Sequence, residues 1–151
     1  MQMPDYDSFF RAYVDFYNGA LAEKPVIGDL RQCYAEFIVG ASPGSVMGGE
    51  NGEEYGKVLD KGFGFYRAIG VTKMSVRRTE ASEIMAGHDM IRVFFRADMR
   101  RKDGSEFPVD FEVVYIAQRR DGGPKIFAFM SDNELELFKK LGVVDAEGKP
   151  V

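Results

Sequence analysis

The chain has 151 residues, of which 45% are hydrophobic and 29% charged, and its 20 Lys and Arg against 24 Asp and Glu leave a net charge of -4. This composition is typical of a soluble globular protein of one domain, and the acidic balance disfavours a nucleic-acid partner. The single cysteine, Cys33, excludes an intramolecular disulfide and a cysteine-cluster metal site, and we expect neither metal nor cofactor.

The N-terminal segment "MQMPDYDSFF" carries acids where a signal peptide needs positive charge, and no long apolar run follows it. We therefore expect a cytoplasmic protein with no membrane association. Apolar residues then recur at helical spacing from Tyr6 to Leu21, which predicts an amphipathic helix capped by Asp5 or Asp7. A short helix over 29–34 and a short strand at "EFIVG" are expected to follow.

The stretch "EFIVGASPGSVMGGENGEEYG", from Glu36 to Gly56, holds six glycines. It lacks the Gly-Lys-Ser/Thr that ends a phosphate-binding P-loop, and its acids would repel a phosphate. We predict a loop at the rim of a pocket rather than a phosphate site. A third helix then begins with Asn51 as its cap and ends at Gly70.

From Val71 onward the apolar residues alternate with the period of two that is typical of strands. The turns "KDG" and "RDG" each fit a three-residue hairpin loop with glycine in the left-handed position. This choice pairs Arg96 with Asp110 in the first hairpin and Tyr115 with Phe127 in the second. Odd-numbered apolar residues then share one face, while opposite charges meet across the other.

The even-numbered face of these strands also carries apolar residues, which makes it a candidate contact surface. We expect a homodimer whose interface contains Phe94, Val114, Ile116, Ile126 and Met130. The segment "SDNELELFKKLGV" predicts a short C-terminal helix. Residues 1–144 then form a single domain, and 145–151 form a polar tail.

The order of the elements predicts an α+β fold, in which a cone-shaped, curved antiparallel sheet carries the N-terminal helices on its concave face. The chain resembles the nuclear transport factor 2-like superfamily, in the branch of the SnoaL-like polyketide cyclases and ketosteroid isomerases. The resemblance covers about residues 7–142 and rests on the stretches "FFRAYVDFYNGAL", "DLRQCYAEFIVGASPG" and "VVYIAQRRDGGPKIFAFMSD". It implies a cystatin-like fold, which hosts catalysts, binders and assembly modules alike.

The resemblance implies only part of a ketosteroid isomerase's acid/base set. Tyr13, in "AYVDF", matches the tyrosine of the oxyanion hole, but Ser42 stands where the isomerases have an aspartate base. No carboxylate occurs near Tyr115, where the acid of the oxyanion hole would fall. The lone histidine, His88, is expected on the outer face, and with Asp89 it forms only a weak dyad candidate.

What the sequence does predict is an aromatic pocket between the helices and the sheet. Its expected lining consists of Tyr13, Tyr17, Tyr34, Phe37, Ser42, Phe65, Tyr66, Phe95, Phe111 and Tyr115. Three hypotheses stay open, the first being that it binds a small hydrophobic molecule. An isomerase, cyclase or dehydratase would need a titratable group in the pocket, from Asp15, Asp60 or Asp132. An oligomerisation module would fill the pocket with its own aromatic side chains.

Overall fold

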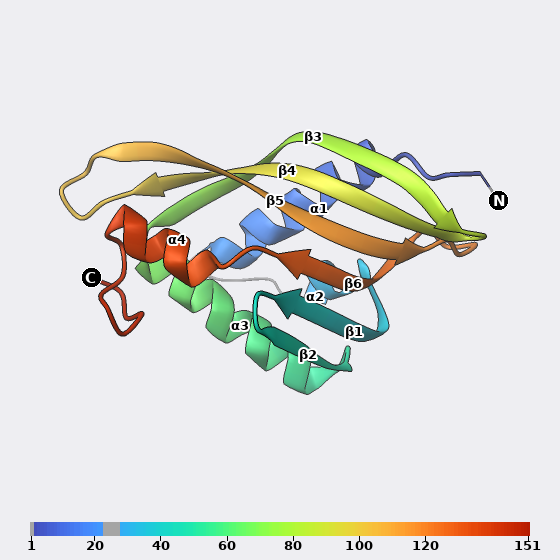
Figure 1. Cartoon of the computed structure of the whole chain (residues 1–151), viewed down its shortest axis with the longest axis horizontal. Coiled ribbons are helices and arrows are strands. Elements are labelled where there is room, and N and C mark those ends of the chain that lie inside the picture. Colours follow the sequence, from blue (N-terminus) through green and yellow to red (C-terminus); the bar gives the residue numbers. More distant parts are fainter. Residues whose placement is uncertain (1, 23–27) are drawn as a thin grey trace.

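The computed structural model describes residues 2–22 and 28–151 (Figure 1). Its elements are α1 (Tyr6–Leu21), α2 (Gly28–Arg31), β1 (Tyr34–Ser42), β2 (Ser45–Glu50), α3 (Glu53–Ala68), β3 (Val71–Met85), β4 (His88–Arg100), β5 (Glu106–Gln118), β6 (Lys125–Ser131) and α4 (Glu134–Leu141). The six strands form one sheet in the order β2-β1-β6-β5-β4-β3. All neighbours are antiparallel except β1 and β6, which are parallel.

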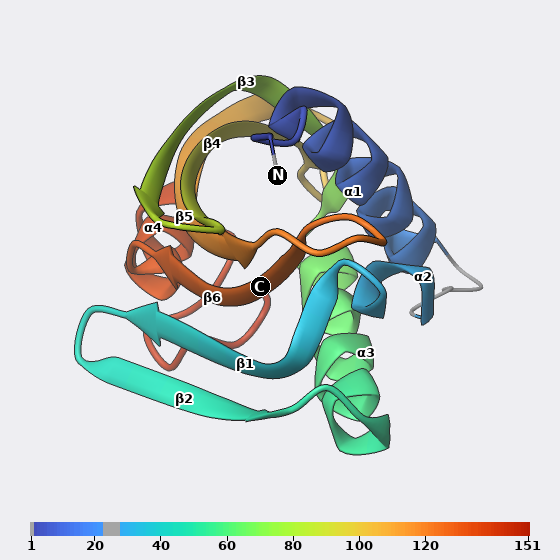
Figure 2. The ribbon, with the colours of Figure 1, turned by 90° about the vertical axis from the view of Figure 1, so that its right-hand side faces the viewer.

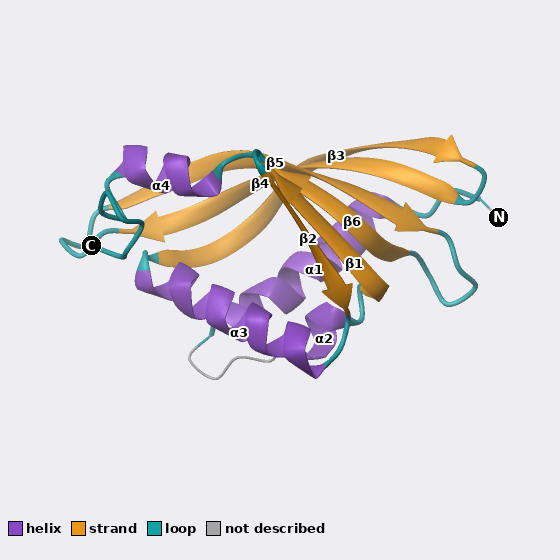
Figure 3. Ribbon diagram, turned by 60° about the horizontal axis from the view of Figure 1, so that its bottom comes forward, coloured by secondary structure: helices purple, strands orange, loops and turns teal. Residues whose placement is uncertain are grey.

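The sheet curves around the helices, as the end-on view shows (Figure 2). Helices α1, α2 and α3 lie on one side of it, while α4 follows β6 and contacts the C-terminal part of α3 (Figure 3). The predicted α+β fold, with helices on the concave face of a curved sheet, is confirmed. The space between α1, α3 and the sheet is where a site can form.

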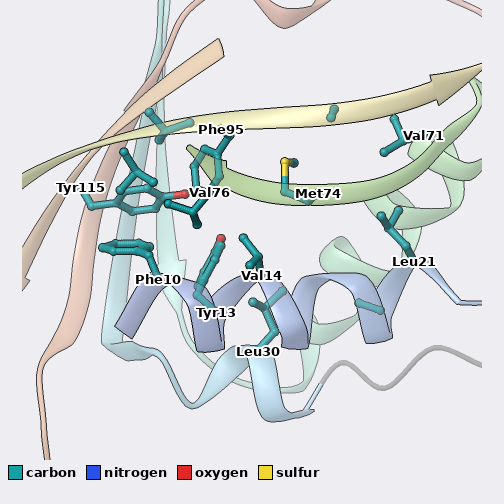
Figure 4. Close-up of a cluster of buried hydrophobic side chains, with 14 of the residues drawn as sticks. Phe10, Tyr13, Val14, Leu21, Leu30, Val71, Met74, Val76, Phe95 and Tyr115 are labelled. Atoms are coloured by element: carbon teal, nitrogen blue, oxygen red, sulfur yellow. The ribbon is translucent and has the colours of Figure 1, made fainter. Parts of the chain in front are cut away.

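Helix α1 is fixed in place by its buried face and by a polar contact with β3. Asp5 caps the helix by accepting a hydrogen bond from the Ser8 amide at 3.1 Å. Phe10, which is fully buried, packs toward the sheet with a ring centroid 4.7 Å from that of Tyr115 (Figure 4). The Asn18 side chain donates to the Met74 carbonyl and accepts from the Met74 amide, which ties α1 to β3. Met74 lies between two positions where the pairing of β3 with β4 is irregular.

The β4–β5 hairpin has the predicted register. Arg96 lies opposite Asp110, and Gly104 adopts a φ of 89° in the turn. Arg96 binds the Asp110 carboxylate through Nε at 2.7 Å and a terminal nitrogen at 3.0 Å. The even face therefore has the cross-strand charge pairing that the sequence predicted.

The predicted register of the β5–β6 hairpin is wrong by two residues. Tyr115 lies opposite Phe129 rather than Phe127: the longer connection, which places Lys125 opposite Gln118, accounts for one residue of the offset, and an irregularity in the pairing of β5 with β6 accounts for the other. A register shift between Ile116 and Ala117 then reverses the parity, so that Ala117 lies opposite Ile126. Ile126 consequently faces the core and is fully buried.

The glycine-rich stretch is a β-hairpin and not the predicted loop. Strand β1 continues to Ser42, the chain turns at Gly44 with a φ of 78°, and β2 returns along β1 with every residue exposed. Asn51 does not cap α3; instead its amide donates to the Arg31 carbonyl at 2.9 Å and its oxygen accepts from Arg31 Nε. The second helix is also shorter than predicted, since it ends at Arg31 and Tyr34 begins β1.

The predicted C-terminal helix is present as α4. Asn133 caps it by accepting from the Glu136 amide at 3.1 Å, and Gly142 ends it in the left-handed conformation. Residues 145–151 turn back on themselves, and a bridge between Val144 and Pro150 closes the turn. No helix within the described residues is long and apolar enough to cross a membrane.

Candidate functional site

A cavity of about 310 Å³ lies inside the curve of the sheet, and we call it the cone cavity. Its walls come from α1, α2, α3, five strands and the start of α4. The residues that line it are Tyr13, Tyr17, Leu30, Tyr34, Tyr55, Val58, Leu59, Gly62, Phe63, Tyr66, Met74, Phe95, Phe111, Val113, Tyr115, Phe129, Ser131 and Glu134. Its surface is therefore largely aromatic, with tyrosine hydroxyls and one carboxyl group as its main polar features.

Seven of the ten side chains predicted to bind a ligand line this cavity: Tyr13, Tyr17, Tyr34, Tyr66, Phe95, Phe111 and Tyr115. Three lie elsewhere. Phe37 is 63% exposed because its neighbour Ile38 takes the inward position on β1. Ser42 is exposed next to the hairpin turn and does not line the cavity, although its sequence position matched that of the isomerases' aspartate base. Phe65 packs against Phe138 on the side of α3 away from the cavity.

Two tyrosine hydroxyls meet inside the cone cavity. The hydroxyl oxygens of Tyr13 and Tyr34 are 2.8 Å apart and share a hydrogen bond, although the residues come from α1 and β1. The ring of Tyr115 lies beside that of Tyr13, with centroids 5.9 Å apart (Figure 4). Burial raises the pKa of all three phenols, so they are neutral near pH 7 and can donate a hydrogen bond to a ligand.

The carboxyl group of the cavity belongs to Glu134, at the start of α4. The Tyr66 hydroxyl donates to Glu134 Oε2 at 2.9 Å. Burial raises the pKa of this carboxyl group, and the hydrogen bond from Tyr66 partly opposes that shift. The carboxylates that the sequence offered instead, Asp15, Asp60 and Asp132, do not line the cone cavity and are exposed.

Sequence reasoning missed Glu134 because an acid in the first turn of a helix is common on solvent-exposed faces. One local signal was present, namely that Glu134 is four residues before Phe138, the residue that α4 buries. Residues four apart share a helix face, so the side chain of Glu134 points in the same direction as the buried ring. The sequence does not show what this face of α4 contacts; only the packing of α4 beside the cavity places the carboxyl group of Glu134 in its lining.

A second hollow, of about 640 Å³, adjoins the cone cavity, and we call it the α4 groove. The two share Tyr17, Tyr66, Met74, Phe111, Ser131 and Glu134, so Glu134 lies at their junction. The rest of the α4 groove contains several acids, Asp110, Glu112, Asp132 and Glu136, and one base, Lys140. Three of these acids are paired with bases outside the lining: Asp110 with Arg96, Glu112 with Arg92 and Glu136 with Lys139.

The outer face of the sheet bears four of the five residues predicted for a dimer interface. Met130 is 45% exposed and lies opposite Val114, while Phe94 and Ile116 are half-buried. The guanidinium of Arg78 covers the Phe94 ring at 3.7 Å. Ile126 cannot belong to this surface, because the register shift in β5 turns it into the core.

A second buried carboxylate, which the sequence offered only as a weak dyad partner of His88, lies outside the cavity. Asp89 is fully buried on the inner face of β4 and accepts hydrogen bonds from the Tyr6 hydroxyl at 2.6 Å and from Arg119 at 2.6 and 2.8 Å. Arg119 also pairs with Glu83 at 2.9 Å. This group connects the start of α1 to the ends of three strands.

His88, the neighbour of Asp89, does not form a dyad with it. Its Nδ1 lies 2.9 Å from the Ala86 carbonyl and its Nε2 lies 3.3 Å from the Gln118 side chain. The described residues contain no cluster of three or more His, Cys, Asp or Glu side chains able to hold a metal ion. The chemistry available at the candidate site is thus that of hydroxyls, aromatic rings and one carboxyl group.

Comparison with protein families identifies the fold. A family model described as "NTF2-like protein (DUF6841)" matches residues 4–134. The chain belongs to this family. The nuclear transport factor 2-like assignment is thereby confirmed, while membership of the SnoaL-like branch stays a prediction. No curated protein matches the chain.

Solved structures similar to this family member carry diverse descriptions. A putative aromatic ring hydroxylase from Novosphingobium aromaticivorans aligns with a TM-score of 0.61 and 14% identity over 87% of this chain and 91% of its own. A ketosteroid isomerase-like protein from Erwinia carotovora atroseptica gives 0.58 and 15% over 83% and 91%. The association domain of C. elegans CaMKII gives 0.59 and 7% over 85% and 95%. At such identities the similarity shows the fold alone.

Proposed function

We propose that this NTF2-like protein binds a small, hydrophobic, ring-bearing molecule in the cone cavity. The observation that carries the proposal is the pair of buried hydroxyls of Tyr13 and Tyr34 in an aromatic cavity of about 310 Å³. Cavities of this size and lining, with a few converging polar groups, are typical of small-molecule sites. The lining rings supply area for apolar contact, and the hydroxyls orient the ligand through hydrogen bonds.

The cavity itself argues against the hypothesis of a core completely filled by its own aromatic side chains. Gly62 of α3 lines the cavity, and a Cβ atom added there would meet nothing within 4 Å. A larger residue at this position can therefore occupy ligand space without disturbing the backbone. Gly64, two residues away, does not line the cavity and serves as a matched control.

The test is a fluorescence titration with 2-naphthol, a neutral ring-bearing probe. We expect saturable binding by the unmodified protein and by Gly64→Leu, and a loss of about tenfold or more in affinity in Gly62→Leu. Replacing either glycine within the helix should favour folding by roughly 1 kcal/mol, so lost binding cannot be attributed to unfolding. Equal affinity in both variants, or no saturable binding at all, would remove the cone cavity as the site.

Acid/base catalysis by an isomerase, cyclase or dehydratase is the second candidate, and Glu134 is the observation that favours it. A carboxyl group whose pKa is raised by burial can accept or donate a proton nearer to neutral pH than an exposed one. A β,γ-unsaturated cyclic ketone, followed by ultraviolet absorbance, tests proton transfer. Conversion that is absent, or that is unchanged in Glu134→Gln, would reject this role.

We also propose that the protein is a cytoplasmic homodimer associating through the outer face of the sheet. The supporting feature is the apolar patch formed by Phe94, Val114, Ile116 and Met130. Sedimentation of Phe94→Glu should give a monomer mass. Val46→Glu, which places the same charge on the exposed strand β2, should leave the mass unchanged. A dimer that survives the first change would refute this interface.

A further inference from the structure

We propose that the ligand of the cone cavity is an organic cation, with an amine bound at Glu134 and its rings held among the aromatic side chains. The inference rests on the proposed binding function and adds the chemical class of the ligand. It is carried by the position of Glu134 at the junction of the two hollows, where it accepts a hydrogen bond from Tyr66 of α3 and shares the lining with Tyr17 of α1.

The charge of the cone cavity is the first argument. Within the described part of the chain, no Lys, Arg or His lines the cavity, and Glu134 is its one carboxyl group. Glu134 also takes part in none of the ion pairs of the described residues. A partly buried carboxylate with a single hydroxyl donor is electrostatically incomplete, and a cation complements it.

The aromatic rings around the carboxyl group are the second argument. The ring centroids of Tyr17 and Tyr66 are 6.3 Å apart, and Phe63 lies 4.6 Å from Tyr17 and 6.1 Å from Tyr66. The faces of aromatic rings carry negative electrostatic potential and attract ammonium groups. A carboxylate bordered by several such rings therefore matches an ammonium group attached to an apolar body.

The approach to the site is the third argument. Three acids of the α4 groove are paired with bases, Asp110 with Arg96, Glu112 with Arg92 and Glu136 with Lys139. The other two charges of its lining, Asp132 and Lys140, have opposite signs, so Glu134 at the junction is the charge that the groove leaves uncompensated. An anionic ligand would be repelled by the ionised Glu134, whereas a neutral ligand would gain nothing from its charge.

Protonation of Glu134 should control the affinity. The groups that face it are the phenols of Tyr17 and Tyr66 and, at longer range, that of Tyr13; burial raises the pKa of each, so none of them titrates near pH 7. Burial also raises the pKa of Glu134. An ammonium group favours the ionised carboxylate, so amine affinity should rise with pH through the carboxyl titration and level off above it.

The test compares two probes of nearly equal shape, 1-naphthylmethylamine and 1-naphthylmethanol, by calorimetric titration near pH 7. We expect the amine to bind at least about tenfold more tightly than the alcohol, the range of a charge-assisted hydrogen bond with a cation–π contact. Glu134→Gln should abolish this preference. Glu53→Gln, an equal charge change at an exposed residue of α3 that lines neither hollow, should preserve it.

A measurement on the unmodified protein keeps the inference testable if Glu134→Gln fails to fold. The amine preference should disappear at about pH 4, where the carboxyl group is protonated. Equal binding of both probes near pH 7 would overturn the cationic ligand and leave the binding proposal intact. Binding of neither probe would overturn both, and a preference that persists in Glu134→Gln would overturn the assignment to this residue.

Discussion

Two carboxyl groups of this protein each accept a hydrogen bond from a tyrosine, yet their surroundings differ. Asp89 accepts from Tyr6 at 2.6 Å and is also bound by Arg119, whose hydrogen bonds lower the pKa of Asp89. Glu134 accepts from Tyr66 at 2.9 Å without an ion-pair partner among the described residues, and burial raises its pKa. The comparison distinguishes a carboxylate that holds the fold together from one that is available to a ligand.

The largest expected effect comes from breaking the paired carboxylate. Asp89→Ala leaves the Tyr6 hydroxyl without its acceptor and leaves Arg119, whose side chain is only 7% exposed, with the more exposed Glu83. Breaking a buried ion pair on one side costs about 3–5 kcal/mol of unfolding free energy. Urea denaturation monitored by circular dichroism measures the loss.

The control for that change is Glu83→Ala, which removes a partner of Arg119 that is 49% exposed and should cost less than about 1 kcal/mol. The pH dependence is a further check. Because the folded-state pKa of Asp89 is lowered, its contribution is present above the unfolded value of about 3.9 and is lost as pH falls through the folded value. A cost below about 1 kcal/mol for Asp89→Ala would refute the structural role.

A smaller loss is expected when only the hydroxyl donor is removed. Tyr6→Phe keeps the ring packed on Phe9 and Phe10 but deletes a hydrogen bond to a charged group, at a cost of about 1.5–3 kcal/mol. Thermal unfolding gives the difference. If Tyr6→Phe and Asp89→Ala cost the same, the ion pair with Arg119 contributes nothing of its own.

Removing the charge of Glu134 should raise the free energy of unfolding, whereas removing that of Asp89 lowers it. Glu134→Gln removes a charge that burial disfavours, so the folded state should gain stability near neutral pH. The sign follows from linkage: with a raised folded-state pKa, the unmodified protein loses stability as pH rises from the unfolded value of about 4.3 through the folded value. The gain should therefore vanish at about pH 4, and a variant less stable at every pH would contradict this assignment.

The smallest expected effect is a change in the pKa of Glu134 itself. Tyr66→Phe deletes the hydroxyl that favours the charged form, so the pKa of Glu134 should rise further above its ordinary value. A carboxyl-detected NMR titration measures it, with Tyr55→Phe as a control whose hydroxyl belongs to the same cavity. A pKa that falls in Tyr66→Phe would show that the hydroxyl does not stabilise the carboxylate.

The sequence by itself determined α1, α3, α4, the strands after Val71 and one hairpin register. The β4–β5 pairing of Arg96 with Asp110 followed from a short loop and from charges that match only in that register. The alternation that buries Phe95 and Tyr115 could be read in the same way, and it supplied the part of the predicted aromatic lining that comes from β4 and β5. Local periodicity was sufficient here because each constraint lies within a few residues of the turn.

Only the tertiary structure decided the remainder. Ile126 faces inward because a shift in the neighbouring strand changes its parity, and the glycine stretch becomes a hairpin because β1 continues along β6. The positions of Asp89 beside Arg119 and of Glu134 beside Tyr66 join residues 30 and 68 positions apart. Spacing within one element fixes which way a side chain points, but the groups that it meets depend on how distant elements pack, and that packing sets the charge state of both carboxyl groups.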